Sequence, residues 1–329
     1  MANSPPRVLI TGSSGFIGGR LFERFAADGW QAVGLGRRPT DQPGYVSHDL
    51  AHPLPETLGT FDVVIHAAAR SSPWGRRQEF DRQNVLATRH VLDHCLRHGR
   101  PRLVFLSSSS VYYRPEHQLG ITEDTPMPER AVNEYAATKQ RAEELVKAYP
   151  GGWVILRPRA VFGPGDTVLL PRILAAARAG KLPLLKSGGP PAVGDLIYID
   201  NLVDCCVKAA ADPAVDGCIN VTNNEPVVLH EFMLDLFRRL DIPAPTRRVS
   251  QGIAMFGAGL IERFYSWFRP DHEPPITRFG IHVFAYSKTF DVTRMLSVLG
   301  PPRVKLAEAL ERTVAWEKEA RSSNTPSPS

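Results

Sequence analysis

The sequence predicts an α/β protein with a doubly wound parallel sheet and a smaller C-terminal lobe. Short apolar runs alternate with amphipathic helical patterns in the first half of the chain, and this alternation is typical of βαβ units joined by right-handed crossovers. The first apolar run leads directly into a glycine-rich turn and a helix, at Val8–Gly18. After about Gly163, prolines and glycines become frequent, which favours a separate lobe.

The expected elements follow in the order that a βαβ chain requires. Strand-like runs lie at Arg7–Thr11, Gln31–Leu35, Val63–His66, Arg102–Ser107 and Val154–Arg157. Helical patterns lie between them, at Phe16–Ala27, Glu79–His98 and Asn133–Ala148. Two later runs are expected to return to the main sheet as strands, and these are Leu196–Asp200 and Cys218–Val221.

The glycine-rich turn has the spacing G-x-x-G-x-x-G, at Gly12, Gly15 and Gly18. The first glycine permits a sharp turn, the second lets backbone N–H groups approach a pyrophosphate, and the third lets the helix pack closely on the sheet. The following helix directs its positive end at the phosphates. Between a strand and a helix, this motif indicates a Rossmann-type dinucleotide site more than an ordinary glycine-rich turn. We therefore also expect cofactor contacts at Ser14, Phe16 and Ile17.

The end of the second strand bears on the choice of cofactor. NAD-binding members of this fold usually carry an acidic residue there for the ribose hydroxyls. This chain has Gly36, followed by Arg37 and Arg38. Guanidinium groups bind phosphate bidentately, and no carboxylate is present to repel a 2′-phosphate. The sequence favours NADP(H) over NAD(H), and the alternative is that both arginines belong to a solvated loop.

Tyr135 and Lys139 lie four residues apart, on one face of a predicted helix. The strand before them ends in four serines, Ser107–Ser110, at the sheet edge where ligands bind. A serine hydroxyl can bond a substrate oxygen, and Tyr135 can exchange a proton with it. Because a free phenol has a pKa of about 10, we expect the Lys139 ammonium to lower the pKa of Tyr135. The pattern predicts proton transfer at a carbon–oxygen centre, and the alternative is an ordinary helix surface.

Together these motifs resemble the extended short-chain dehydrogenase/reductase family over nearly the whole chain. The resemblance rests on Thr11–Gly18, Asp49-Leu50, His66–Ala69, Asn84, Ser107-Ser108, Tyr135-x-x-x-Lys139 and Arg157-Pro158. It implies catalytic roles for Ser108, Tyr135 and Lys139, with Ser109 as the second choice of serine. It also implies that Asn84 supports the lysine through water. Further cofactor contacts implied by the resemblance are Asp49, Leu50, Ala67, Ala68, Ala69 and Pro158.

Three more segments resemble the 3β-hydroxysteroid dehydrogenase branch, and in particular bacterial 2-alkyl-3-ketoalkanoic acid reductases of olefin biosynthesis. They are Ser71–Gly75, Tyr198–Asn201 and Glu273–Phe279. The steroid members often bind NAD, so the two arginines after Gly36 depart from their pattern.

The resemblance implies an enzyme that interconverts a ketone and a secondary alcohol on a small hydrophobic substrate, either a β-keto acid or a steroid-like ring. A cation would then meet the carboxylate of a β-keto acid, with Arg278 and Arg159 as candidates. One alternative is an NAD-dependent nucleotide-sugar epimerase or dehydratase, which uses the same Ser–Tyr–Lys machinery. Another is a non-catalytic cofactor-binding regulator.

A second indication of an apolar substrate is the segment Ile253–Phe268, which is rich in large apolar residues. Its polar residues form one stripe on a helix, Glu262, Arg263, Ser266 and Arg269. The segment is shorter than the roughly 20 apolar residues that a bilayer span needs. Three interpretations remain: a buried helix of the small lobe, a lid over the substrate, or a membrane-surface helix. Gly257 and Gly259 weaken a rigid helix and favour the lid.

For the whole chain, we expect an NADP(H)-binding domain at 1–162 with sheet-completing segments near 196–222, a mainly substrate-binding lobe at 163–320, and a disordered tail at 321–329. The net charge of +5 suits an anionic cofactor, and the scattered basic residues argue against nucleic acid. The four cysteines lack metal spacing, so we expect no metal. No signal peptide opens the sequence, which favours the cytoplasm, and a homodimer is left open.

Overall fold

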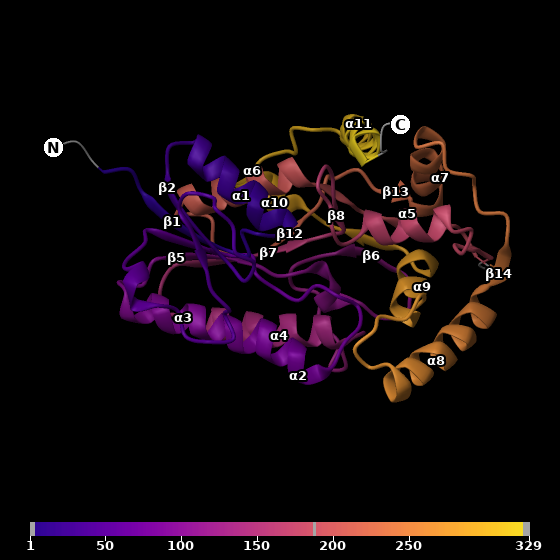
Figure 1. Ribbon diagram of the computed structural model, residues 1–329, viewed down its shortest axis with the longest axis horizontal. Helices are drawn as coiled ribbons and strands as arrows, with labels where there is room; N and C mark the ends of the chain where they lie inside the picture. The colour runs from indigo at the N-terminus through magenta and orange to yellow at the C-terminus, as the bar shows by residue number, and fades with distance from the viewer. Residues whose placement is uncertain (1–3, 187–188, 325–329) are drawn as a thin grey trace, which may run out of the picture.

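The centre of the protein is a seven-stranded parallel sheet, seen in a computed structural model that describes residues 4–186 and 189–324 (Figure 1). Its strand order is β12-β7-β5-β4-β1-β2-β3, and every neighbouring pair is parallel. This confirms the predicted doubly wound sheet. The strands are β1 (Arg7–Thr11), β2 (Gln31–Gly36), β3 (Tyr45–Ser47), β4 (Val63–His66), β5 (Arg102–Leu106), β7 (Trp153–Pro158) and β12 (Gly217–Val221).

Helices cover both faces of this sheet because its strands are apolar on both sides. Val8 and Ile10 of β1 share one buried cluster with α1 (Phe16–Ala27) and α6 (Ile199–Ala211). Leu9, between them, belongs to the cluster on the other face, with α3 (Ala87–Arg97) and α4 (Glu134–Lys147). Figure 1 shows these two helical layers above and below the strands.

Two predicted elements differ in detail from the structure. The helical pattern at Glu79–His98 forms three consecutive pieces, α2 (Arg77–Phe80), the π-helix η2 (Asp81–Leu86) and α3. The run Leu196–Asp200 does not return to the main sheet. Its β11 (Ile197–Tyr198) pairs with β8 (Val161–Phe162) in a separate two-stranded sheet, because α6 already begins at Ile199. The other run, at Cys218–Val221, joins the main sheet beside β7, as predicted.

A four-stranded sheet joins the middle and last thirds of the chain. Its order is β13-β10-β15-β6, with β13 (Val227–Val228), β10 (Val193–Gly194), β15 (Lys288–Phe290) and β6 (Gln118–Ile121). The pairing of β6 with β15 brings a segment from the predicted cofactor domain into the lobe. The rest of the lobe comprises α5 (Leu170–Arg178), β9 (Leu184–Lys186), α7 (Leu229–Arg239), β14 (Arg248–Ser250), α8 (Gln251–Phe268) and α9 (Arg278–Ala285).

The remaining elements are the short 3-10 helices η1 (Glu56–Leu58) and η3 (Ser109–Tyr112), and the C-terminal helices α10 (Thr293–Val298) and α11 (Leu306–Asn324). The predicted disordered tail at 321–329 is wrong for its first four residues, because residues 321–324 belong to helix α11. Residues 325–329 lie outside the described residues.

One of the three interpretations of the segment Ile253–Phe268, a buried helix of the small lobe, does not agree with helix α8 as it is found in the structure. Ala254 and Ala258 are its buried residues, whereas its large apolar side chains are exposed. It lies at the edge of the lobe (Figure 1). No helix within residues 4–186 and 189–324 has the length and apolarity needed to cross a membrane.

Candidate active site

The carboxyl ends of the central strands open into one cavity of about 1610 Å³. A pocket for one small ligand usually measures roughly 300–1,000 Å³, so this cavity has room for a dinucleotide and a substrate together. All the residues expected to contact the cofactor line it, and so do Ser108, Tyr135 and Lys139. Asn84, which was also expected at the catalytic site, does not line the cavity.

The glycine turn fits a pyrophosphate. Gly12 has a φ of +76°, and a Cβ there would lie 2.9 Å from the Ala68 Cα. A Cβ on Gly18 would lie 2.2 Å from the Gly12 carbonyl oxygen, so a side chain at this position would separate α1 from the turn. The first turn of α1 carries no acidic residue. Its amide end therefore faces the cavity without a competing negative charge, as an anion site requires.

The end of β2 leaves little space for a carboxylate. A Cβ on Gly36 would come within 2.7 Å of both the Ser14 Oγ and the Tyr45 hydroxyl. The two arginines beyond it differ. Arg38 Nη2 donates to the Ser14 carbonyl oxygen. The Arg37 side chain, by contrast, has no hydrogen bond or ion pair with any residue that the structure describes. Arg37 is thus the cation left available to a ligand.

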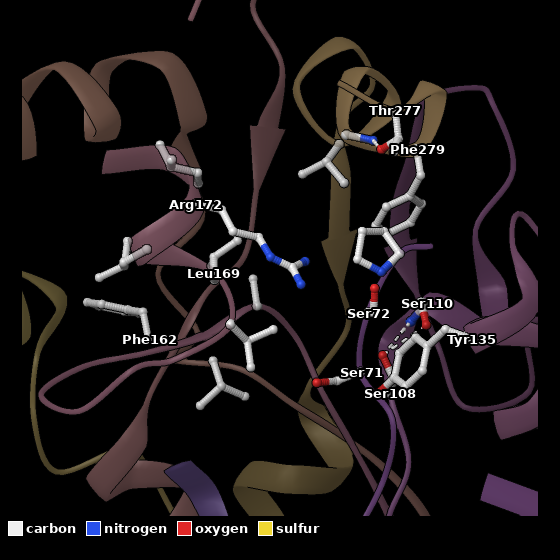
Figure 2. A pocket seen from close by; sticks show the side chains of 18 of the residues that line it. Ser71, Ser72, Ser108, Ser110, Tyr135, Phe162, Leu169, Arg172, Thr277 and Phe279 are labelled. Carbon is white, nitrogen blue, oxygen red and sulfur yellow. Dashed lines mark hydrogen bonds between the residues drawn. The ribbon is translucent and has the colours of Figure 1, made fainter. Parts of the chain in front are cut away.

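The four serines after β5 face different partners. Ser107 Oγ donates to Glu143 Oε1 at 2.5 Å, and Ser109 Oγ lies 3.2 Å from the Tyr113 hydroxyl. Ser108 caps the start of η3, and its Oγ accepts hydrogen bonds from the Ser110 amide at 3.2 Å and the Ser110 hydroxyl at 2.9 Å. Figure 2 shows Ser108 beside the Tyr135 ring. Ser108 is therefore the serine that the fold brings to Tyr135, and it hydrogen-bonds the phenol.

The pKa of Tyr135 differs from the sequence expectation. Burial raises this pKa to about 12, and the Ser108 hydrogen bond only partly opposes the rise. The predicted lowering by Lys139 is wrong for the cofactor-free protein. Lys139 Nζ donates instead to the Leu106 carbonyl oxygen at 2.7 Å and lies 4.6 Å from the centre of the Phe105 ring. Burial lowers the pKa of this lysine to about 7.

A buried ion pair between Glu143 and Arg157 lies beneath these residues and was not predicted from the sequence. Glu143 is fully buried and receives two hydrogen bonds from Arg157, from Nε at 2.9 Å and from Nη2 at 2.6 Å. The signal was present, because Tyr135, Lys139 and Glu143 recur every four residues on α4. The pair ties α4 to β7 and, through Ser107, to β5. It thereby fixes the helix that carries Tyr135.

Asn84 supports the site from behind rather than lining it. Its Oδ1 accepts from the Arg70 amide at 2.7 Å, and its Nδ2 donates to Thr138 Oγ1 at 2.8 Å. It thus contacts the residue that precedes Lys139. His66 has a similar supporting place between Thr11 Oγ1 at 2.7 Å and Thr88 Oγ1 at 3.0 Å. Burial, with a smaller effect of the Lys139 charge, lowers the pKa of His66 to about 3, so this imidazole is neutral.

The part of the cavity away from the glycine turn is walled mainly by apolar side chains from β8, α7, α9 and α5 with the residue before it. These include Phe162, Leu169, Ile173, Phe232, Phe279 and Phe284. Arg172 points into this space (Figure 2) and forms an ion pair with Glu273 at 3.0 Å. The wall can accommodate a large apolar group.

The two candidate cations for a carboxylate have different surroundings. Arg278 does not line the cavity, and its Nε is bound to Glu262 at 2.7 Å. Arg159 lines the cavity, is 5% exposed, and lies 5.3 Å from the centre of the Tyr113 ring. Its buried Nε and Nη2 have no hydrogen-bond partner among the described residues. The fold therefore brings Arg159, and not Arg278, to the cavity.

Comparison with known proteins identifies the family. The model of the NAD dependent epimerase/dehydratase family matches residues 8–222. The 2-alkyl-3-oxoalkanoate reductase of Shewanella oneidensis is 31% identical over 96% of this chain and 87% of its own length. The 3beta-hydroxysteroid-dehydrogenase/decarboxylase isoform 1 of Arabidopsis thaliana is 31% identical over 86% of this chain and 68% of its own.

Among solved structures, MoeE5 in complex with UDP-glucose and NAD superposes with a TM-score of 0.74. It is 24% identical, and the match covers 96% of this chain and 99% of MoeE5. This likeness shows the fold. The chain therefore belongs to the NAD dependent epimerase/dehydratase family and is an NAD(P)-dependent oxidoreductase of the extended short-chain dehydrogenase/reductase type, with relatives in the 3β-hydroxysteroid dehydrogenase branch.

Proposed function

We propose that this protein is an NADP(H)-dependent reductase that interconverts a ketone and a secondary alcohol on a hydrophobic substrate, either a β-keto acid or a steroid-like ring. One observation carries the proposal: the Ser108 and Tyr135 hydroxyls meet in a cavity whose far wall is apolar. The similarity to reductases named for 2-alkyl-3-oxoalkanoates supports the same substrate class.

The proposed chemistry divides between three side chains. A bound nicotinamide cofactor would supply the hydride to the carbonyl carbon. Ser108 donates a hydrogen bond to the carbonyl oxygen, and Tyr135 gives that oxygen its proton. Because burial raises the pKa of Tyr135 to about 12, the phenol is protonated at neutral pH, as an acid in ketone reduction must be. Lys139, which lines the cavity, would hold the nicotinamide ribose of the bound cofactor.

Arg159 is proposed to bind the carboxylate of a β-keto acid. A buried charge without a partner is costly, so a substrate anion would stabilise this guanidinium. Lys288 is a second cation close to Arg159. Burial lowers the pKa of Lys288 to about 8, and the charge of Arg159 acts in the same direction. Asp195 is a nearby carboxylate that Arg159 also influences.

NADP(H) is proposed over NAD(H) because Arg37 lines the cavity without a partner among the described residues, next to Gly36, which brings no carboxylate. The alternative is a nucleotide-sugar epimerase. It is supported by the likeness to MoeE5, which was solved with UDP-glucose and NAD. The apolar far wall speaks against it, because a sugar offers hydroxyl groups that such a wall leaves unpaired.

The test is a reductase assay of the purified protein with a homologous series of 2-alkyl-3-oxo acids. Each added CH₂ that enters the cavity contributes up to about 0.8 kcal/mol, so kcat/KM should rise up to about fourfold per carbon. Tyr135→Phe keeps the ring and removes the acidic proton, so it should lose most turnover and keep cofactor binding. Tyr149→Phe, a buried tyrosine outside the cavity, is the matched control. A flat series, or turnover of UDP- or dTDP-sugars instead, would favour the epimerase.

A further inference from the structure

The buried residues of helix α8 are two alanines, whereas most of its large apolar residues are exposed. Ala254 and Ala258 pack against Ile281 and Ala285 of α9. Six large apolar residues are between 53% and 71% exposed: Ile253, Phe256, Leu260, Phe264, Trp267 and Phe268. Their spacing of three or four residues, with one adjacent pair at the end, places them along one face. We call these six residues the α8 apolar face. Scattered surface hydrophobics are ordinary, but a continuous row of this size marks an interaction site.

The orientation of α8 is fixed by contacts at both ends and in the middle. At its start, β14 pairs with β9, and the Ser250 hydroxyl accepts a hydrogen bond from the Ile253 amide. In the middle, Glu262 accepts hydrogen bonds from the Arg278 amide and Nε, both at 2.7 Å. Just beyond its end, Trp74 Nε1 donates to the Pro270 carbonyl oxygen at 3.2 Å. The helix is therefore held with its large side chains outward.

The charges beside the α8 apolar face that have no ion-pair partner among the described residues are positive. Arg247, Arg248, Arg263 and Arg269 lie on or beside the helix, and none has an ion-pair partner among the residues that the structure describes. Glu262, the one acidic residue in α8, is bound to Arg278. The Arg263 guanidinium lies 5.2 Å from the centre of the Trp267 ring, so a cation accompanies the aromatic edge of the face.

This charge pattern distinguishes between two occupants. A second copy of the chain, docked through the same face, would bring these unpaired arginines against one another. An anionic lipid surface would instead pair them with phosphates, while the apolar side chains enter the acyl boundary. Tryptophan, phenylalanine and arginine on one helix side are the composition that a membrane interface favours.

We propose that α8 docks this protein on the surface of an anionic lipid bilayer, lying in the interface plane with the α8 apolar face inserted. The opposite side of the α8–α9 layer, including Gln251, Ile281 and Ala285, lines the cavity. If the proposed function holds, an apolar ketone leaves the bilayer next to the cavity that receives it. The docking itself depends on no reaction.

The experiment is flotation of the full chain with phosphatidylcholine vesicles, with and without phosphatidylglycerol. The wild type should float with the phosphatidylglycerol vesicles, and less so at high salt. The variant Phe264→Ser/Trp267→Ser should lose at least tenfold in bound fraction, and so should Ile253→Ser/Phe256→Ser at the other end of the helix. Arg263→Gln/Arg269→Gln should lose binding to the anionic vesicles. Leu119→Ser, which changes a 69% exposed leucine on β6, should bind like the wild type.

Two outcomes overturn the proposal. One is that the wild type does not float with either vesicle. The other is that the apolar variants float as well as the wild type. A concentration-dependent dimer in light scattering, lost in the Phe264→Ser/Trp267→Ser variant while flotation is absent, would assign the face to a second copy. Each variant's thermal unfolding shows whether it folds. Since flotation needs no turnover, failure of the reductase assay and failure of docking are separate results.

Discussion

At the scale of single residues, the site contains side chains that can bind a ligand and side chains whose protonation state is set by burial. Arg37 and Arg38 have adjacent places in the sequence and separate roles in the structure. Arg38 is bound to the backbone of the glycine turn, whereas the Arg37 side chain is free of partners among the described residues. Cofactor selectivity should therefore depend on Arg37, and the shape of the turn on Arg38.

Replacing Arg37 by alanine should weaken NADPH binding and leave NADH binding nearly unchanged. A charge-assisted hydrogen bond contributes about 1.5–3 kcal/mol, so the Kd for NADPH should rise roughly ten- to hundredfold. Arg38→Ala should instead weaken both cofactors, because it loosens the turn that both use. Fluorescence titration of each variant with the two nucleotides checks this. Equal wild-type affinity for NADPH and NADH would refute the assignment.

Lys139 makes stability depend on pH in a defined direction. Its folded pKa of about 7 lies below its ordinary value of 10.5, so between these values the unfolded chain binds more protons than the folded one. The wild type should therefore gain stability as pH rises through this window. Lys139→Met should be more stable than the wild type near pH 7, with the difference shrinking toward pH 10.

Urea unfolding of the cofactor-free protein across this pH range measures that difference. Lys147→Met is the matched control, since this exposed lysine on the same helix pairs with Glu144 at the surface. A pH-independent difference for Lys139→Met would mean that the buried ammonium carries no such penalty.

At the scale of elements, the cavity is closed by contacts between two loops far apart in the sequence. The loop after β4 and the segment between α8 and α9 meet through Trp74 and Pro270, through the Arg76–Asp271 ion pair at 3.0 Å, and through Ser72 and Glu273 at 3.2 Å. Glu273 also holds Arg172 of α5. The cofactor side and the lobe are thus joined across the cavity.

These loop contacts should not contribute equally. Both partners of the Arg76–Asp271 pair are more than half exposed, and such pairs contribute at most about 1 kcal/mol. Arg76→Gln should therefore change the KM for an apolar ketone little, whereas Trp74→Ala should raise it several-fold with a smaller effect on kcat, because it removes a partly buried ring. Trp316→Ala, on α11, is the control. Steady-state kinetics that gave Arg76→Gln the larger effect would contradict this.

Much of the fold and the cofactor site could be predicted because local rules decide them. Gly12 needs a positive φ, Gly18 has no room for a Cβ, and the continuous apolar strands need a sheet covered on both faces. What could not be predicted depends on distant partners. The raised pKa of Tyr135 is caused by burial, which the helix periodicity does not reveal. The choice between Arg159 and Arg278 depends on Glu262, which binds Arg278. Helix α8 shows the same limit, because its composition suits burial but its buried residues are the small Ala254 and Ala258.

At the scale of the whole molecule, the pairing of β6 with β15 has a consequence for folding during synthesis. The Gln118 amide donates to the Ser287 carbonyl oxygen, and Lys288 reaches back to the Glu116 carbonyl. A ribosome must therefore make most of the chain before β6 finds its neighbour. Until then the central sheet can assemble while the β6 edge stays open to wrong partners. The last strand among the described residues thus completes both the lobe and the pairing of β6, so we expect nascent chains that lack β15 to depend on chaperones.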